Sequence, residues 1–593
     1  MNTSSRFHFR RESLMNSKGT HVMAAGLLLG GLAWCSAASA AMVPVRGNVP
    51  PVVAKATFVS HHSPTAVLDI NVALPLRNSG QLNYFLHHLQ DRSSPYFHQF
   101  LSPAQFKAAY GPTDTDVDAV KAFLTQRGIK VLGISRSNTR VYARGTTAAL
   151  ESAFGVSINN YSYKGTSFYS AGSDPLVPSS LKVSAVMGLE NAVQLKPHSV
   201  QGPTPAGAGL GPSGYMPLAI ATAYNWPDIT NTANGAGVTI GIVTAFSFRP
   251  LDLAKFWSVA GVPAHNATNG NPITIKPEKM GLTVLGTNEL NGETTLDIER
   301  SSSMAPGAAV DVYEAVNPQF TNFDVIFQQA ADDDLVQVIS TSWGAPENQN
   351  PTSSLSAEHA TFQQLASEGV AVMAAAGDGG AADREAPGSD NADFPSSDPY
   401  VIAAGGTTFP NLSDLTTETA WSGAGGADST LFAEPSFETG TSGFTSNTAC
   451  PSDETSLFPD DTINTPNEPG DGCAGSGNPS RQSSDMAMDA DPFTGYAIYY
   501  NGRWEVFGGT SFVAPQLAGL FADLRQQKGA PIGPGPALVY CVGNDPSPVV
   551  TPLFNDITSG SNGFPAGTGW DHPTGFGSPN AQNFFTDALA HCL

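Results

Sequence analysis

Residues 238–243 read VTIGIV, a short apolar run rich in β-branched side chains. Similar runs recur downstream, and segments with helical periodicity separate several of them: Val310–Tyr313, Val336–Ser340, Val370–Ala376 and Tyr400–Ala404. Buried strands separated by helices indicate a parallel sheet that is covered on both faces. In such sheets the functional site lies beyond the carboxyl ends of the strands. The sequence therefore predicts an α/β domain over residues 215–593.

A smaller α/β unit is predicted upstream, within residues 41–198. Residues 66–76 alternate like a strand, and residues 82–89 have the spacing of a buried helix face. A second helical stripe, two strand-like runs and a short helix at 146–154 follow. This order of elements suits a ferredoxin-like sandwich.

The first 40 residues are predicted to be a secretory signal peptide. Basic residues precede an apolar stretch at 22–34, and Ala38-Ser39-Ala40 supplies the small residues of a cut before Ala41. A membrane anchor is the alternative, although no later segment is apolar for long enough to span a bilayer. We expect export to the periplasm or the extracellular space, no membrane association after signal removal, and a monomer.

Charge divides the chain into two parts of opposite sign. The 593 residues carry a net charge of −23, which argues against a nucleic-acid partner. Residues 42–198 have a net charge of +6, whereas residues 199–593 have −32. This asymmetry suggests a basic pro-segment that covers an acidic body, and acid would weaken the attraction between them. Two unrelated domains are the alternative.

A linker is predicted between the two parts. The stretch QGPTPAGAGLGPSG at 201–214 indicates a flexible, cleavable segment over 199–214.

Four cysteines remain once Cys35 leaves with the signal. An even number in an exported protein fits two disulfides, for which three pairings are possible. We favour Cys450–Cys473 and Cys541–Cys592, because each closes the shorter loop.

Ser511 is the candidate nucleophile. It lies in GGTSFVAP at 508–515, where glycines allow a tight turn and a helix with free N–H groups follows. A helix N-cap is the alternative role of this serine. The sequence contains no His-Gly dipeptide, so the histidine motif of subtilisin-type enzymes is missing.

Carboxylates offer a different base. Glu293 and Asp297 are four residues apart in GETTLDIE, so on a helix they share one face. Such a pair does not ionise fully, and it can exchange a proton with a serine. Asp378 follows an apolar run in AAAGDGG, where a protonated carboxyl group would donate to an oxyanion. Taken alone, the Glu/Asp spacing more often marks a solvated helix face, and an aspartate before glycine more often forms a turn.

Together these motifs resemble those of the sedolisin family of serine-carboxyl peptidases, and residues 41–198 resemble its kumamolisin-type activation domain. The resemblance implies that Ser511 is the nucleophile, Glu293 the base, Asp297 its proton-sharing partner and Asp378 the oxyanion stabiliser. STSWG at 340–344 matches a structural strand end near the substrate cleft. Where some members carry a glutamate after the first core strand, this chain has Ala245-Phe246, which puts an extended acid network there in doubt.

The resemblance extends to a calcium loop in FNDITSGSNGFPAGTGWDHPTGFGSP at 554–579. Asp556 and Asp571 would supply carboxylates to one structural Ca²⁺, and Ile557, Gly567 and Gly569 would supply carbonyls; a plain loop of Asx turns is the alternative. The implied function is a secreted, acid-acting endopeptidase, made as a zymogen, that cleaves proteins or peptides and is inhibited by its own pro-domain. A histidine-dependent enzyme and a catalytically inactive binding protein on the same scaffold are the competing hypotheses.

Overall fold

The computed structural model describes residues 41–203, 211–227, 233–281, 283–383, 391–444 and 479–593. The predicted signal peptide, residues 204–210 of the predicted linker and the predicted Cys450–Cys473 disulfide lie outside these residues. The second predicted disulfide, Cys541–Cys592, is confirmed, and it joins cysteines 51 residues apart.

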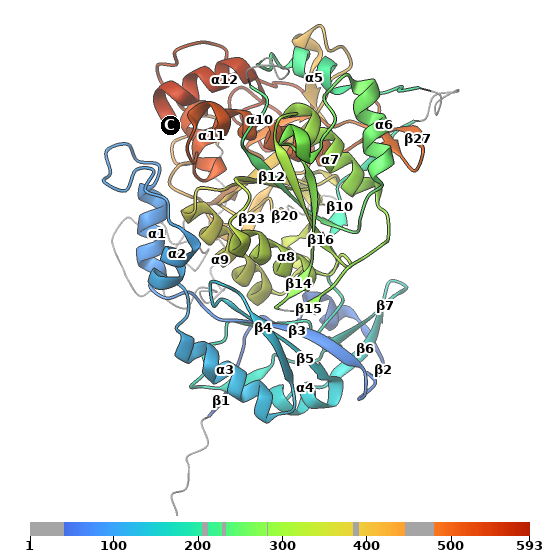
Figure 1. The fold of residues 1–593 in the computed structure, drawn as a ribbon, viewed down its shortest axis with the longest axis vertical. Helices are drawn as coiled ribbons and strands as arrows, with labels where there is room; N and C mark the ends of the chain where they lie inside the picture. The colour runs from blue at the N-terminus through green and yellow to red at the C-terminus, as the bar shows by residue number, and fades with distance from the viewer. Residues whose placement is uncertain (1–40, 204–210, 228–232, 282, 384–390, 445–478) are drawn as a thin grey trace, which may run out of the picture. The chain divides into compact units, whose positions relative to one another are not determined.

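The N-terminal domain is built around a four-stranded antiparallel sheet with the order β4-β5-β3-β9. Its elements follow one another as β3 (Val67–Ala73), α3 (Asp114–Gln126), β4 (Lys130–Ile134), β5 (Arg140–Thr146), α4 (Thr147–Phe154) and β9 (Ala185–Met187). This βαββαβ order is the ferredoxin-like arrangement predicted from the sequence. Both α3 and α4 pack through their apolar faces on one side of the sheet (Figure 1).

Several elements of this domain were not predicted. A second antiparallel sheet comprises β2 (Thr57–His61), β6 (Ile158–Tyr163) and β7 (Thr166–Ala171). The short strand β1 (Met42–Pro44) pairs with β8 (Leu176–Pro178), and α2 (Pro103–Ala109) follows α1 (Ser79–His88). β2 carries no buried residue, so hydrophobic alternation could not reveal it.

The C-terminal domain contains an eight-stranded sheet with the order β13-β16-β12-β17-β19-β21-β22, and β25 also pairs with β21. All of these pairings are parallel except the one with β22. The strands are β12 (Thr239–Ala245), β13 (Ile273–Pro277), β16 (Ala309–Ala315), β17 (Val338–Thr341), β19 (Ala371–Ala375), β21 (Val401–Thr408), β22 (Thr419–Ala420) and β25 (Met486–Asp489). The predicted parallel sheet is therefore confirmed.

Helices cover both faces of this sheet (Figure 1). Ile240 and Ile242 of β12 enter one core with α6 (Pro250–Ala260), α7 (Gly292–Met304), α10 (Val513–Lys528), α11 (Gly535–Gly543) and α12 (Ala581–Asp587). Val243 and Ala245 enter the opposite core with α8 (Phe320–Asp333) and α9 (Thr352–Ser367). Burial on both faces explains why these strands read as continuous apolar runs.

A buried ion pair connects the two domains. Arg140 and Asp324 are both 0% exposed, and Arg140 Nη2 lies 2.7 Å from Asp324 Oδ1. The guanidinium also donates to Thr361 Oγ1 at 3.2 Å, and Asn71 donates to Asp324. Nearby, the Arg136 and Ser137 amides donate to Asp332. The attachment is therefore a specific hydrogen-bonded contact in addition to the complementary charge that the sequence shows.

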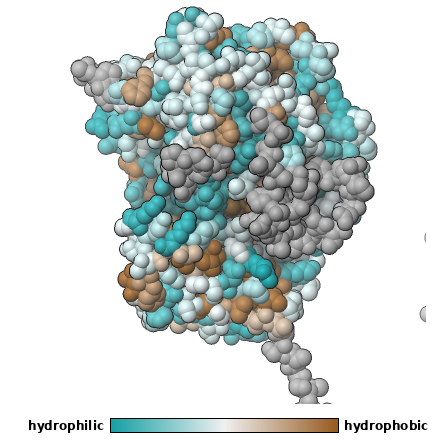
Figure 2. Space-filling model, turned by 180° about the vertical axis from the view of Figure 1, so that it is seen from behind, coloured by the Kyte–Doolittle hydropathy of each residue, from teal (hydrophilic) through white to brown (hydrophobic). Residues whose placement is uncertain are grey.

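On the face shown in Figure 2, hydrophobic residues form small separate groups among hydrophilic ones. Within the described residues, no helix is both long enough and apolar enough to cross a membrane.

Replacing Asp324 by asparagine should destabilise the docked N-terminal domain, because the change leaves the Arg140 guanidinium buried without its counter-charge. We expect a loss of about 3–5 kcal/mol in the free energy of unfolding, measured by urea denaturation of a Ser511→Ala precursor. Asp69→Asn is the matched control: it breaks the Arg144–Asp69 pair, whose side chains are 37% and 31% exposed, and should cost no more than about 1 kcal/mol. Equal losses in the two variants would contradict a special role for the buried pair.

Candidate functional site

The helix α7 carries the two predicted carboxylates. It begins after Asn291, whose side chain caps it by accepting a hydrogen bond from the Glu293 amide at 2.8 Å. Every residue from Glu293 to Met304 is buried, so neither carboxylate belongs to a solvated helix face. Glu293 and Asp297 lie one turn apart and are 2% and 0% exposed.

Asp297 is held by a serine that the sequence had assigned only to a structural strand end. Ser342 lies between β17 and β18 (Trp343–Pro346), and its hydroxyl donates to Asp297 Oδ1 at 2.6 Å. The Trp343 indole donates to the Thr244 hydroxyl, which lies 3.0 Å from that of Thr294. Ala245-Phe246 is the place where this chain lacks the glutamate that some members of the resembled family carry. The polar groups around it are thus hydroxyls and an indole.

Ser511 lies in a tight turn between β27 (Arg503–Gly508) and α10. Gly509 has a φ of 109°, which an L side chain rarely adopts, and residues 510–512 form a single 3-10 turn. No side chain caps α10, so Ser511 does not act as an N-cap. Ser511 is 0% exposed, and its hydroxyl has no fully formed hydrogen bond.

Asp378 lies three residues beyond β19 and faces the same turn. Its Oδ1 accepts hydrogen bonds from the Thr510 amide at 2.8 Å and the Thr510 hydroxyl at 2.9 Å. These contacts join residues 132 positions apart, so Asp378 does more than form a local turn. The structure therefore brings together all four predicted residues, from α7, the end of β19 and the turn before α10.

The chain that leaves the N-terminal domain crosses this site. β10 (Lys196–Pro197) pairs antiparallel with β18, and β11 (Val200–Gln201) pairs antiparallel with β27. Between them, the Ser511 amide donates to the His198 carbonyl oxygen at 2.9 Å, and the His198 amide donates to Ser342 O at 3.0 Å. The beginning of the predicted flexible linker is thus an ordered strand, because both walls of the cleft supply backbone partners.

The His198 carbonyl and Asp378 lie beside the same backbone atom. A Cβ atom added to Gly509 would lie 2.2 Å from His198 O and 2.4 Å from Asp378 Oδ2. The carbonyl oxygen is therefore bounded by the Ser511 amide and the Asp378 carboxyl group, which is the arrangement of an oxyanion hole. Glycine at 509 is required by both the backbone conformation and this crowding.

The His198 side chain is buried against Asp393. Its Nε2 lies 3.1 Å from Asp393 Oδ1, and the two side chains are 1% and 0% exposed. Asp393 belongs to β20 (Asp393–Phe394), which pairs with β18. A Cβ atom added to Gly344 would lie 1.8 Å from Asp393 Oδ1, so this glycine leaves room for the pair. Asp393 was not among the predicted residues, because no motif connects it to the nucleophile.

Burial raises the pKa of both carboxyl groups on α7. The pKa of Glu293 rises to about 8, mainly through desolvation, while nearby hydroxyls of Ser199 and Ser511 act in the opposite direction. Neither hydroxyl is aligned with Glu293 as a full hydrogen bond. Burial and then the charge of Glu293 raise the pKa of Asp297 well above its ordinary value. The pair therefore keeps a proton at neutral pH.

In the expected calcium loop, backbone amides contact both predicted carboxylates. The Gly569 amide lies 3.2 Å from both carboxylate oxygens of Asp556, and the Gly567 amide donates to Asp571 Oδ2 at 2.9 Å. Ile557, which follows Asp556 in the sequence, is buried. Burial raises the pKa of Asp571 to about 6, and the charge of Asp556 contributes to the rise. Two carboxylates that repel each other across a glycine-rich turn fit a hard cation.

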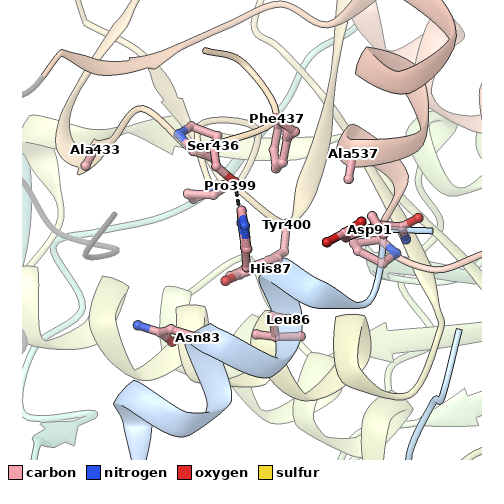
Figure 3. A pocket seen from close by; sticks show the side chains of 13 residues that line it. Asn83, Leu86, His87, Asp91, Pro399, Tyr400, Ala433, Ser436, Phe437 and Ala537 are labelled. Carbon is pink, nitrogen blue, oxygen red and sulfur yellow. Dashed lines mark hydrogen bonds between the residues drawn. The ribbon is translucent and has the colours of Figure 1, made fainter. Parts of the chain in front are cut away.

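A cavity of about 280 Å³ lies elsewhere, between α1 of the N-terminal domain and the C-terminal domain (Figure 3). His87 points into it and its Nδ1 lies 2.6 Å from Ser436 Oγ. Leu86, Phe437 and Ala537 supply apolar walls. None of the four predicted site residues lines this cavity, which belongs to the domain interface.

Both domains match known protein families. Residues 54–192 match the family "Pro-kumamolisin, activation domain", and residues 259–534 match the "Subtilase family". Kumamolisin from Bacillus sp. strain MN-32 is 30% identical over 532 residues, which cover 86% of this chain and 90% of that protein. Xanthomonalisin from Xanthomonas sp. strain T-22 is 31% identical, with 88% of this chain and 66% of that protein covered.

A solved structure gives the same result. The structure of Pseudomonas sedolisin, a serine-carboxyl proteinase complexed with two molecules of pseudo-iodotyrostatin, has a TM-score of 0.51 at 25% identity and covers 63% of this chain and 98% of its own. The match to a pro-kumamolisin activation domain identifies residues 54–192 as a pro-domain. From its pro-domain to its subtilisin-like peptidase domain, the chain belongs to the sedolisin family of serine-carboxyl peptidases.

Proposed function

We propose that this chain is the precursor of a secreted, acid-acting endopeptidase that uses Ser511, Glu293, Asp297 and Asp378 and that first cleaves itself between His198 and Ser199. One observation carries the proposal: the segment that joins the pro-domain to the peptidase domain crosses the cleft as a substrate would, with the His198 carbonyl hydrogen-bonded to the Ser511 amide. A catalytically inactive binding protein would not need this alignment of nucleophile, carboxylates and carbonyl.

In the proposed reaction, the reactive form of the pair carries one proton, on Asp297, so that Glu293 is ionised. Ser511 Oγ bonds to the substrate carbonyl carbon, the carbonyl π electrons move onto the oxygen, and the serine proton passes to Glu293. The negative charge that develops on the carbonyl oxygen is held by the Ser511 amide and by protonated Asp378. Thr510 donates twice to Asp378 Oδ1, which leaves the proton to Oδ2, the atom beside the carbonyl. Glu293 then protonates the leaving amine, and water hydrolyses the acyl-enzyme with Glu293 again accepting a proton.

Protonation of buried acids stabilises the folded precursor. Because the pKa of Glu293 is raised to about 8, the folded state binds this proton more tightly than the unfolded chain does. Its contribution to stability is therefore complete below the unfolded pKa and is lost as pH rises through about 8. Burial acts on Glu278 and Glu438 in the same way, raising each pKa to about 8. Burial acts in the opposite direction on His98 and His265, whose pKa values it lowers to about 4, so these two groups reduce stability in acid.

The catalytic proposal predicts that Ser511→Ala and Glu293→Gln each lower kcat by at least about 10³-fold. The first change removes the nucleophile, and the second replaces the base with an amide that cannot accept the serine proton. The assay is hydrolysis of a denatured protein at about pH 4 by enzyme whose pro-domain has been removed. Glu289→Gln, an exposed change four residues upstream, is the matched control and should retain full activity. A Glu293→Gln enzyme that keeps most of its kcat would disprove the carboxylate-base mechanism.

We also propose that Asp393 selects the residue before the cleaved bond. The imidazole of His198 lies against the Asp393 carboxylate, and both side chains are almost fully buried. A buried carboxylate favours a side chain that donates a hydrogen bond or carries positive charge over an apolar one. The preferred substrates are therefore proteins and peptides with His, Arg or Lys at this position.

Acidification of the precursor from pH 7 to pH 4 should release a product that begins at Ser199, identified by mass and N-terminal sequencing. A first cut inside residues 66–154 would refute this cleavage site.

Asp393→Asn should lower kcat/KM about 10- to 100-fold for peptides with His or Arg before the cleaved bond, as expected for loss of a charge-assisted hydrogen bond. A peptide with Leu at that position serves as the control, and its kcat/KM should change little. Equal losses of kcat/KM on the His, Arg and Leu peptides would refute the role of Asp393 in specificity.

Calcium binding at Asp556, Ile557, Gly567, Gly569 and Asp571 is the last part of the proposal. Bound there, Ca²⁺ would neutralise two carboxylates and fix the loop between α11 and α12. Asp571→Ala, or a chelator, should lower the melting temperature, because a ligand at 100 times its Kd stabilises the fold by about 2.7 kcal/mol. Asp414→Ala, which removes an exposed Asx-turn carboxylate, should leave the calcium-dependent shift intact. A melting temperature that does not respond to chelator would remove the site.

A further inference from the structure

Three side chains with metal-ligating atoms lie together near the C-terminus, apart from the catalytic groups and the calcium loop. Asp545 follows α11, Asp587 is the last residue of α12, and His591 lies in the final turn of the chain. One oxygen or nitrogen atom from each lies within 4.8 Å of the other two. Among the described residues, this is the one group of three such side chains at that spacing.

The contacts leave part of the cluster unsatisfied. His591 Nδ1 bonds to Asp545 Oδ2 and lies 3.6 Å from Asp587 Oδ1, which also accepts from the Val549 amide at 2.8 Å. Asp587 is 0% exposed, and its Oδ2 has no hydrogen-bond partner. A buried carboxylate oxygen without a donor is costly, and one imidazole does not balance two carboxylates.

The surroundings hold these groups in place while leaving a route from solvent. The Cys541–Cys592 disulfide ties the residue next to His591 to α11. Arg92 of the pro-domain donates to the Ala590 carbonyl at 3.2 Å and to the His591 carbonyl, which fixes the backbone. The His591 side chain remains 40% exposed, so an ion can reach the buried Asp587 past its ring.

We propose that Asp545, Asp587 and His591 bind a divalent transition-metal ion of the zinc class at neutral pH. One imidazole nitrogen and two carboxylate oxygens suit Zn²⁺, which would complete its coordination with water. The bound ion satisfies the Asp587 oxygen and joins positions 46 residues apart, Asp545 and His591. It thereby forms a second clasp beside the disulfide, around a segment that includes the loop from Asp556 to Asp571.

The test uses a tag-free Ser511→Ala precursor at pH 7, saturated with Ca²⁺ and titrated with Zn²⁺ by calorimetry. We expect one zinc ion per chain and at least a tenfold loss of affinity in both His591→Asn and Asp587→Asn. Co²⁺ in place of zinc should give visible absorption bands that the variants lose. His88→Asn is the matched control, since His88 lies 3.5 Å from a single carboxylate, that of Asp91.

His591→Asn decides the test if Asp587→Asn fails to fold, because the histidine ring is partly exposed and its replacement leaves the disulfide intact. Circular dichroism of the metal-free variants establishes that they are folded. Zinc binding that is absent from the parent protein, or equal in the parent and His591→Asn, would overturn the proposal and leave the cluster as an ion pair between a histidine and two aspartates.

Discussion

The hydrogen bond from the Ser511 amide to the His198 carbonyl fixes the arrangement of the site. For it to form, β10 and β11 must pair with opposite walls of the cleft, which anchors the pro-domain and covers the catalytic groups. That cover contributes to the complete burial of Ser511 and the near-complete burial of Glu293. Burial in turn raises the pKa of Glu293, while the hydroxyl of Ser199 in the same segment acts in the opposite direction.

The parallel sheet brings these distant residues together. β17 and β19 are neighbours in the sheet, and the chain reaches Ser342 immediately after β17 and Asp378 soon after β19. Their side chains therefore emerge at the same edge, where α7 and the turn before α10 complete the site. The helix α7 is buried along nearly its whole length, so its polar residues must find partners inside the protein, as Asp297 does with Ser342.

Much of the fold was predictable because it follows from periodicity. The core strands are apolar on both faces, and the pro-domain helices carry regular apolar stripes, so their existence was clear from the sequence. The outer sheet β2-β6-β7 was missed because β2 has no buried residue. The strand at the beginning of the linker was not predicted. Gln201 lies in a charge-free, glycine-rich stretch, and composition cannot reveal its backbone pairing with β27.

The sequence by itself determined the chemical types at the site: a serine between a glycine turn and a helix, two acids one helical turn apart, and an aspartate after a buried strand. Local spacing suffices for each of these. Only the tertiary structure decided that the four lie around one carbonyl, that Asp393 contacts the buried His198 side chain, and that Asp587 meets Asp545 and His591. Those contacts join residues distant in the chain, and no local pattern encodes them, because they depend on how the strands and helices pack.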